Sequence, residues 1–315
     1  MKNLFIKSFL AIPIISLLFA CEDAVDVTLE NAEPLVVVDA FITNRAEPQV
    51  IKLMRTQPYF ATELPPTLTG ASVTITDSEG KVYTFTETSP GNYTWTPAAN
   101  ETFGEVGLDY TLEIETNGES FEAFADMSRV PTVDSLTFFF EPGDQFTDDF
   151  VLAEFWSTDP DDSGDAYWIK TYKNGKLLNK PVDINLAYDA GFSRGSNFNG
   201  VPFIVPIRRA INPFDEDPND DTKVLPPLVL GDSLYVEVNS LSEAAFDFLT
   251  ELKIQTDRPG GFGELFATPL ANVSTNIRNK NANGTKAVGF FSVAAVSGFG
   301  RKYKSTDDVK DFPKQ

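Results

Sequence analysis

Short segments in which apolar and polar residues alternate dominate the chain from residue 35 onward. Residues 71–77, for example, read ASVTITD, with Val73 and Ile75 on the same side of the segment. Such period-two alternation buries one face of a β-strand and leaves the other face in water. The Asn-Gly pairs at residues 117–118 and 174–175 are favoured in type I′ hairpin turns. The pattern therefore predicts a mainly β fold.

Seven predicted strands follow one another at short intervals before residue 130: residues 35–43, 49–56, 71–77, 82–87, 93–96, 109–115 and 120–127. This spacing predicts a β-sandwich over residues 34–129. The run from Gly70 through Tyr93 is similar to the immunoglobulin-like or transthyretin-like modules found on bacterial surface proteins.

A domain boundary is predicted at Pro131, because proline disfavours both helices and central strands. A second β-rich domain follows over residues 130–300. Its predicted strands are residues 136–140, 150–157, 167–173, 176–178, 233–239 and 289–296. We therefore expect two tandem β-sandwich domains, the first immunoglobulin/transthyretin-like and the second with one inserted helix.

The inserted helix is predicted near residues 241–255. Ser240 and Glu243 have the spacing of a capping box, which satisfies the free N–H groups at a helix start. Apolar residues then recur at helical spacing and share one face: Leu241, Ala245, Phe248, Leu249 and Leu252. Residues 258–261, Arg-Pro-Gly-Gly, end the helix, and residues 301–315 are expected to form a frayed polar tail.

Residues 1–20 have the pattern of a secretory signal peptide, in which Lys2 and Lys7 precede an apolar run. The run is too short to span a bilayer, which takes about 20 apolar residues. Residues 18–21, Leu-Phe-Ala-Cys, then have the pattern of a lipobox, and Cys21 is the single cysteine of the chain. We predict lipidation of Cys21 and, through it, attachment to the outer membrane.

An acidic tether, residues 21–33, follows the predicted cleavage site. It resembles the surface-export signal of Bacteroidota lipoproteins, and an ordinary solvated linker is the alternative. Without residues 1–20 the chain has 23 basic and 46 acidic side chains, a net charge of −23. Nucleic acid and anionic lipid are bound through basic patches, so neither is expected as a partner of the folded body.

The chain contains no histidine. This excludes nucleophiles activated by histidine and zinc sites built on histidine, and with them most hydrolase designs. Residues 191–195, Gly-Phe-Ser-Arg-Gly, match the nucleophile elbow of α/β-hydrolases. That motif needs a strand before it, a helix after it and a histidine elsewhere, so we interpret the match as chance. We expect the protein not to be an enzyme.

A candidate calcium loop lies at residues 159–165. Asp159, Asp161, Ser163 and Asp165 place oxygen ligands at alternate positions, a spacing that can curl round a hard cation. The glutamate of a calcium loop is missing, because Lys170 stands at the twelfth position. Aspartate and serine are also ordinary turn residues, and a simple acidic turn is the alternative. No other cofactor is expected.

A long predicted loop, from about residue 187 to residue 227, is the candidate binding region. Phe192, Phe198 and Phe203 are interleaved there with small polar residues, and Arg208 follows. Loops of this length are uncommon unless they are functional or disordered. These four side chains are predicted to contact a ligand or a partner protein. The alternative is that the phenylalanines pack the loop onto its own domain.

Six segments of the chain, in their order, resemble the Bacteroidota lipoproteins grouped as the domain of unknown function DUF4249. They are residues 21–23, 35–43, 70–77, 241–249, 269–273 and 289–293. The resemblance covers nearly all of the mature chain. It carries over no catalytic residue, because the family has no agreed activity.

The resemblance implies a place and a partner. Such lipoproteins are commonly encoded beside a TonB-dependent outer-membrane receptor, in the manner of surface lipoproteins that cover these transporters. We therefore expect an outer-membrane, outward-facing lipoprotein that captures substrate for a TonB-dependent β-barrel in nutrient uptake. The alternative is a stand-alone surface binding or adhesion module without a transporter.

Overall fold

The computed structural model describes residues 33–58, 61–143, 148–195, 198–218 and 220–311. The predicted signal peptide, Cys21 and nearly all of the acidic tether lie outside these ranges. Residues 34–315 form one compact unit. The described strands make four sheets, which confirms the predicted mainly β fold. No helix in the described part of the chain has the length and apolar character needed to cross a membrane.

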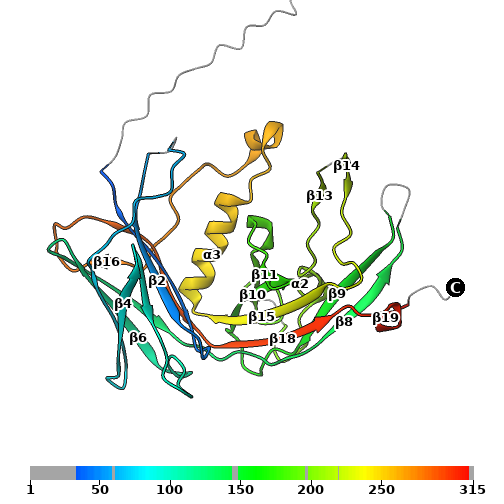
Figure 1. Cartoon of the computed structure of the whole chain (residues 1–315), viewed down its shortest axis with the longest axis horizontal. Helices are drawn as coiled ribbons and strands as arrows, with labels where there is room; N and C mark the ends of the chain where they lie inside the picture. The colour runs from blue at the N-terminus through cyan, green and yellow to red at the C-terminus, as the bar shows by residue number, and fades with distance from the viewer. Residues whose placement is uncertain (1–32, 59–60, 144–147, 196–197, 219, 312–315) are drawn as a thin grey trace, which may run out of the picture. The chain divides into compact units, whose positions relative to one another are not determined.

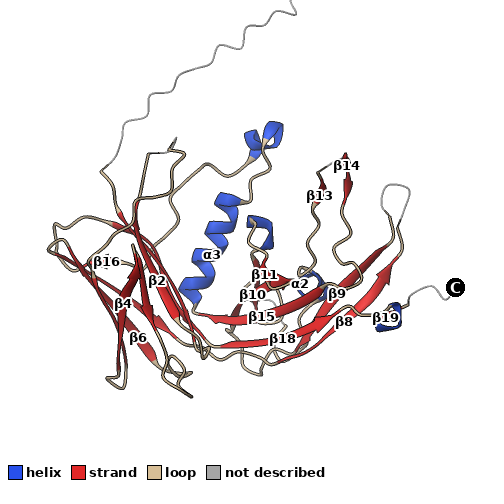
Figure 2. Ribbon diagram, viewed as in Figure 1, coloured by secondary structure: helices blue, strands red, loops and turns tan. Residues whose placement is uncertain are grey.

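The largest sheet has nine strands in the order β16-β7-β6-β3-β4-β5-β2-β1-β17 (Figure 1, Figure 2). Their bounds are β1 (Val36–Thr43), β2 (Gln49–Arg55), β3 (Ser72–Asp77), β4 (Val82–Ser89), β5 (Asn92–Trp95), β6 (Asp109–Thr116), β7 (Glu119–Asp126), β16 (Arg278–Asn279) and β17 (Ala287–Ala294). Neighbours are antiparallel except β1 and β17, which run parallel with Val36 opposite Ala287.

The nine-stranded sheet curls round a single core. Strand β1 alternates between buried and half-buried residues along its whole length. Its buried face packs in the same core as the rings of Tyr83, Phe103 and Tyr110. Strand β17, at one edge of the sheet, contacts β7 near the other edge, so the sheet is nearly barrel-like. The predicted sandwich of two facing sheets over residues 34–129 is therefore not confirmed.

The remaining strands form three smaller sheets. A five-stranded sheet joins β11 (Lys176–Leu177), β10 (Ala166–Lys173), β15 (Ser233–Leu241) and β18 (Val296–Lys302), with β12 (Asn185–Tyr188) also on β10. A three-stranded sheet has the order β19 (Val309–Lys310), β8 (Val133–Glu141) and β9 (Phe150–Ser157). Strands β13 (Glu216–Asp217) and β14 (Asp220–Val224) form a pair. The five-stranded and three-stranded sheets share a second apolar core.

Strand pairing crosses the boundary predicted at residue 130. Strands β16 and β17 come from the segment assigned to the second domain, yet both lie in the nine-stranded sheet. The physical reason is hydrogen bonding: without β17, one edge of β1 would leave its backbone N–H and C=O groups unpaired. Strand β17 pairs with β1 along all eight residues. The first sheet is therefore built from strands between residues 36 and 126 together with two strands between residues 278 and 294.

The helix α3 (Glu243–Thr256) confirms the predicted inserted helix, and its first residues differ from the prediction. Its N-cap is Ser242, whose side chain accepts a hydrogen bond from the Ala245 N–H. Ser240 instead lies in β15, and its hydroxyl accepts a hydrogen bond from the Ala295 N–H. The predicted capping box is therefore wrong, because β15 continues to Leu241. The buried residues of α3 are Ala245, Phe246, Phe248 and Leu249.

Shorter helical segments connect the strands. They are η1 (Pro181–Asp183), α2 (Val205–Arg209), η2 (Gly261–Phe266) and η3 (Thr306–Asp308). Both Asn-Gly pairs have positive φ at both residues, 50° and 78° at 117–118 and 53° and 77° at 174–175, which confirms the two turns.

The segment predicted as a frayed polar tail is ordered as far as residue 311. Tyr303 and Val309 are buried in the second core, and β19 adds a parallel strand to β8. The prediction for residues 301–311 is therefore wrong, because two apolar side chains among polar neighbours are enough to hold this segment on the sheet.

Candidate functional site

A cavity of about 580 Å³ lies between α3 and the segment that runs from η1 to α2. This volume is in the range of sites for small molecules. The lining residues are Val182, Ile184, Asn185, Leu186, Phe192, Ser193, Arg194, Pro206, Ala210, Phe246, Thr250, Lys253 and Ile254. Most of these side chains are apolar, and Arg194 and Lys253 are the two cations among them. The cavity thus combines an apolar wall with two cations, of which Arg194 is paired with the carboxylates of Glu243 and Asp247.

Arg194 fastens the predicted binding loop to α3. Its Nε lies 3.0 Å from Glu243 Oε1, and one terminal nitrogen donates to Asp247 Oδ1 at 2.8 Å. The guanidinium carbon lies 5.5 Å and 5.9 Å from the ring centroids of Tyr188 and Phe246. Contacts of this kind are cation–π interactions. The two carboxylates and two rings therefore fix Arg194 at the mouth of the cavity.

Side-chain to backbone hydrogen bonds hold several of the lining residues in place. Lys253 Nζ donates to the Ile184 carbonyl at 2.7 Å, which joins α3 to the start of β12. Asn185 Nδ2 donates to the Ile207 carbonyl at 3.1 Å, which joins β12 to α2. Because these bonds link three separate elements, the cavity walls are positioned before any ligand arrives.

The structure separates the four residues predicted to bind. Phe192 lines the cavity and is 54% exposed, whereas Phe198, 40% exposed, does not line it. Phe203 is buried in the second core, with its ring 5.7 Å and 5.4 Å from the rings of Phe155 and Tyr167. The alternative of loop packing therefore holds for Phe203.

The fourth residue, Arg208, is also buried. It lies 3.7 Å from Glu154 Oε2, and its guanidinium carbon stands 3.9 Å from the centroid of the Trp156 ring. The arginine at the cavity is Arg194, which we did not predict. The sequence feature that could have pointed to Arg194 is its position two residues after Phe192. Both lie in the Gly-Phe-Ser-Arg-Gly run, which we interpreted as a chance match to the nucleophile elbow.

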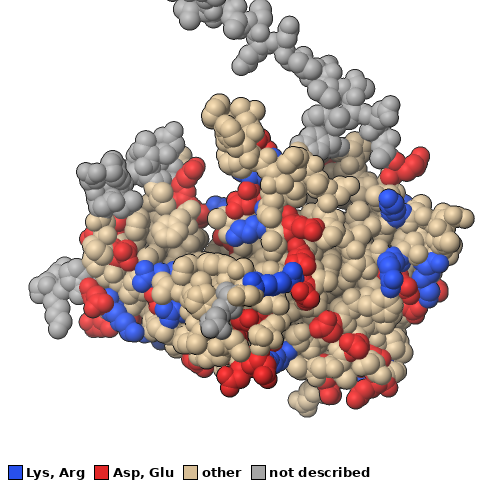
Figure 3. Space-filling model, turned by 180° about the vertical axis from the view of Figure 1, so that it is seen from behind, with Lys and Arg blue, Asp and Glu red and all other residues tan. Residues whose placement is uncertain are grey.

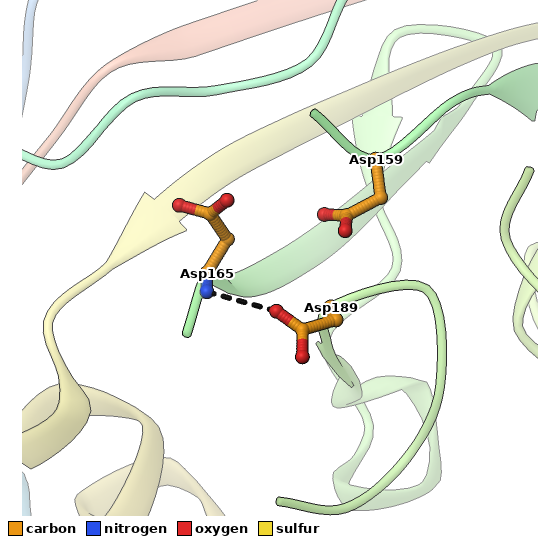
Figure 4. A group of neighbouring side chains, drawn as sticks. All are labelled: Asp159, Asp165 and Asp189. Atoms are coloured by element: carbon orange, nitrogen blue, oxygen red, sulfur yellow. Dashed lines mark hydrogen bonds between the residues drawn. The ribbon is translucent and has the colours of Figure 1, made fainter. Parts of the chain in front are cut away.

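A cluster of three buried carboxylates lies beside the binding loop. One oxygen each of Asp159, Asp165 and Asp189 lies within 4.8 Å of the others (Figure 4). The Tyr167 hydroxyl donates to Asp159 Oδ1 at 2.7 Å. Asp189 Oδ1 accepts from the backbone N–H groups of Gly164 and Asp165. We call these three residues the aspartate cluster.

The aspartate cluster contains half of the predicted calcium ligands. Asp161 and Ser163 are exposed, and Asp161 is not among the three grouped carboxylates, whereas Asp189 takes part although it is distant in the sequence. The predicted set of four ligands stays a prediction, and the structure brings together two of its members. Asp189 is brought to Asp165 by the pairing of β12 with β10, in which Tyr188 lies opposite Ala166.

One guanidinium faces the aspartate cluster. Arg129 binds both oxygens of Asp165, with its nearest nitrogen 2.7 Å from Oδ2, and it also donates to the carbonyl oxygens of Asp161 and Asp162. Burial raises the pKa of Asp159 to about 6, and the Tyr167 hydroxyl limits the rise because it stabilises the charged form. Asp159 therefore takes up a proton at a pH closer to neutrality than an ordinary aspartate does.

Charge elsewhere on the described surface is mixed. The face in Figure 3 shows Asp and Glu side chains in several groups, with Lys and Arg side chains scattered among them. On this face of the described residues the basic side chains form no continuous patch. A single basic surface of the kind that nucleic acid needs is not visible there.

Comparisons with known proteins place the chain in a family. The model of a domain of unknown function, DUF4249, matches residues 22–298. No curated protein matches the chain. The match spans most of the chain, including β1, the aspartate cluster, the cavity, α3 and β17. The chain belongs to the DUF4249 family.

Proposed function

We propose that this chain is an outer-membrane surface lipoprotein that captures a small ligand for a TonB-dependent transporter. The lipobox ending at Cys21 and the acidic tether after it support the location. The cavity between α3 and the binding loop is the observation that carries the capture role, because it joins apolar walls to two positioned cations. The absence of histidine from the sequence favours binding over hydrolysis.

The cavity favours a ligand with an apolar body and an anionic group. Phe192, Leu186 and Phe246 supply apolar surface to the wall, and Arg194 and Lys253 supply charge. Glu243 and Asp247 already offset the charge of Arg194, so the charge that meets a ligand carboxylate is that of Lys253. Lys253 is held by the Ile184 carbonyl, which limits the cost of ordering its side chain. An aryl or medium-chain alkyl carboxylate matches this combination in size and charge.

The tip formed by η2 and the residues after it is the surface we assign to the transporter. Phe262, Leu265, Phe266 and Leu270 are 62–79% exposed, and the rings of Phe262 and Phe266 lie 5.6 Å apart. Gathered apolar side chains on a surface mark sites of protein contact. In Figure 1 this tip stands at the end of α3, away from the sheets.

Ligand-observed NMR on residues 34–315 with a panel of aryl and alkyl carboxylates tests the capture role. We expect a member of the panel to bind with an affinity that Lys253→Met weakens about tenfold or more, as loss of one charge-assisted contact predicts. Phe192→Ala is expected to weaken it as well. Phe198→Ala is the matched control, because Phe198 lies on the same loop but off the cavity. Equal binding by all variants would place the ligand elsewhere.

Mild detergent extraction from the native host tests the partner. The chain is expected to co-purify with a large β-barrel protein, and Phe266→Ser is expected to reduce that recovery. Leu64→Ser is the control, because Leu64 is 91% exposed on another loop. Recovery of the free lipoprotein alone, together with ligand binding by residues 34–315, would favour the stand-alone binding module.

Replacement of the predicted lipidated residue tests the location. Cys21→Ser is expected to release the protein from the membrane fraction, because the acyl chains would have no attachment point. Protease treatment of intact cells should remove the unaltered protein, and full protection would contradict the outward-facing location.

A further inference from the structure

The aspartate cluster lacks balancing charge. Three carboxylates stand against one guanidinium, that of Arg129, and Asp159, Asp165 and Asp189 are 1%, 9% and 2% exposed. Carboxylates this deeply buried are stable only when they are paired, hydrogen-bonded or bound to metal. After Arg129 is counted, a charge of −2 is left, which one divalent cation would neutralise.

A second observation also points to a cation. Asp159 Oδ2 is buried and has no hydrogen-bond partner of good geometry among the described residues, although the Gly200 backbone lies near enough to lower the pKa of this carboxyl. The other oxygen of the same carboxylate is bonded to the Tyr167 hydroxyl. Figure 4 shows the Asp159 carboxylate pointing toward Asp165 and Asp189. A buried carboxylate oxygen without a partner is costly, so its direction into the cluster marks a place for a cation.

We propose that Asp159, Asp165 and Asp189 bind a calcium ion. The ligand atoms are all carboxylate oxygens, the donors that hard cations prefer. Oxygens within 4.8 Å of one another can surround an ion whose bonds are about 2.3–2.6 Å long. Water and backbone carbonyls complete such spheres in flexible loops, and calcium tolerates that irregularity better than magnesium does.

The ion would join three separate segments. Asp159 follows β9, Asp165 precedes β10, and Asp189 follows β12 at the start of the binding loop. The backbone adds two links between the same segments: the Asp189 N–H donates to the Asp165 carbonyl at 2.7 Å and the Asp159 N–H to the Val201 carbonyl at 3.0 Å. Calcium would therefore fix the start of the loop at Asp189, and its ligand Asp159 also holds the loop at Val201, beyond Phe192 and Arg194.

A regulatory consequence follows for the cavity. Because the ion fixes the loop, ligand affinity should rise when calcium is bound. This consequence rests on the proposed function, whereas the ion site does not. Calcium binding without any effect on the ligand would therefore contradict the coupling and leave the site itself intact.

Calorimetry on the full chain in detergent, freed of metal with a chelator, tests the site. We expect calcium chloride to give binding heat for one ion and to raise the thermal unfolding midpoint, because a ligand of the folded state stabilises it. Terbium is expected to give luminescence sensitised by Tyr167, which touches Asp159. Absence of heat, of a midpoint shift and of luminescence would overturn the proposal, and an equal response to magnesium would overturn the assignment to calcium.

Isosteric variants identify the ligands. Asp189→Asn keeps an oxygen that can accept from Gly164 and Asp165, and Asp159→Asn keeps one for Tyr167, so both are expected to fold. Each variant should bind calcium with an affinity at least tenfold lower than that of the unaltered chain. Asp161→Asn is the matched control, since Asp161 is exposed in the same loop, and it should bind as the unaltered chain does. Loss of binding in Asp161→Asn, or retention in both other variants, would refute the ligand set.

Discussion

At the scale of single residues, a buried ion cluster joins two sheets. Glu237 on β15 is 2% exposed, and its carboxylate pairs with Arg45 from the connection between β1 and β2. Asn239 donates to the same carboxylate at 3.0 Å, and Lys170 Nζ lies 4.0 Å from it. Burial lowers the pKa of Lys170, because removing the ammonium group from water destabilises its charged form. Glu237 is therefore the centre on which two cations depend.

The two sides of this cluster should respond differently to substitution. Glu237→Gln is expected to lower the free energy of unfolding by about 3 kcal/mol, because it leaves the buried Lys170 without a counter-charge and removes one of the two carboxylates on Arg45. Lys170→Met should change the free energy of unfolding by less than about 1 kcal/mol, because it removes the more deeply buried cation and keeps the Arg45 pair. Urea unfolding of residues 34–315 measures both.

An exposed pair supplies the control for that comparison. Glu113 and Lys280 lie 2.9 Å apart on the surface, both more than 40% exposed. Exposed pairs contribute little, so Glu113→Gln should leave the urea midpoint unchanged. Equal losses from Glu237→Gln and Glu113→Gln would contradict the role given to burial.

At the scale of elements, the start of α3 depends on one hydroxyl. Ser242 Oγ accepts a hydrogen bond from the Ala245 N–H at 3.2 Å, whereas Ser240 Oγ accepts one from the Ala295 N–H. Ser242→Ala is expected to lower the free energy of unfolding by about 1 kcal/mol, the usual loss on removing a cap. Because α3 forms one wall of the cavity, the same variant should weaken binding of any cavity ligand. An unchanged unfolding curve would contradict the assignment of Ser242 as the cap.

The parallel pairing of β1 with β17 requires glycine at residue 289. Gly289 has φ of +95°, and a Cβ there would lie 2.0 Å from the Val38 carbonyl oxygen. Gly289→Ala should therefore prevent the pairing and yield little soluble protein. Gly80→Ala is the matched control, because Gly80 has φ of +89° with open space around it. It should lose about 1–2 kcal/mol from backbone strain alone. Similar soluble yields for the two variants would refute the steric argument.

At the scale of the whole molecule, residues 34–315 are expected to unfold as one unit. The first sheet needs β16 and β17, which lie far from β1–β7 in the sequence. A fragment of residues 34–129 would leave the edge of β1 unpaired and its apolar face partly uncovered. We expect this fragment to show no cooperative urea transition, whereas residues 34–315 show a single one. A cooperative transition of the fragment would support an independent first domain.

The sequence by itself determined the local structure. Period-two alternation predicted β3, and a run of β-branched and apolar residues predicted β1. Two Asn-Gly pairs predicted their turns, the first of them with β6 and β7 on either side, and helical spacing predicted α3. These signals are local because a strand, a turn or a helix buries its own apolar face whatever its partners are. The same local reasoning placed Phe192 and the 159–165 loop among candidate site residues.

Only the tertiary structure decided which distant segments meet. It paired β17 with β1 and brought Asp189 to Asp159 and Asp165. It buried Phe203 while leaving Phe192 at the cavity, although both are phenylalanines of one loop. Contacts between residues far apart leave no periodic trace in the sequence, since each side chain is specified by neighbours that only the fold supplies. For that reason the elements could be predicted, whereas the nearly closed sheet, the cavity and the aspartate cluster could not.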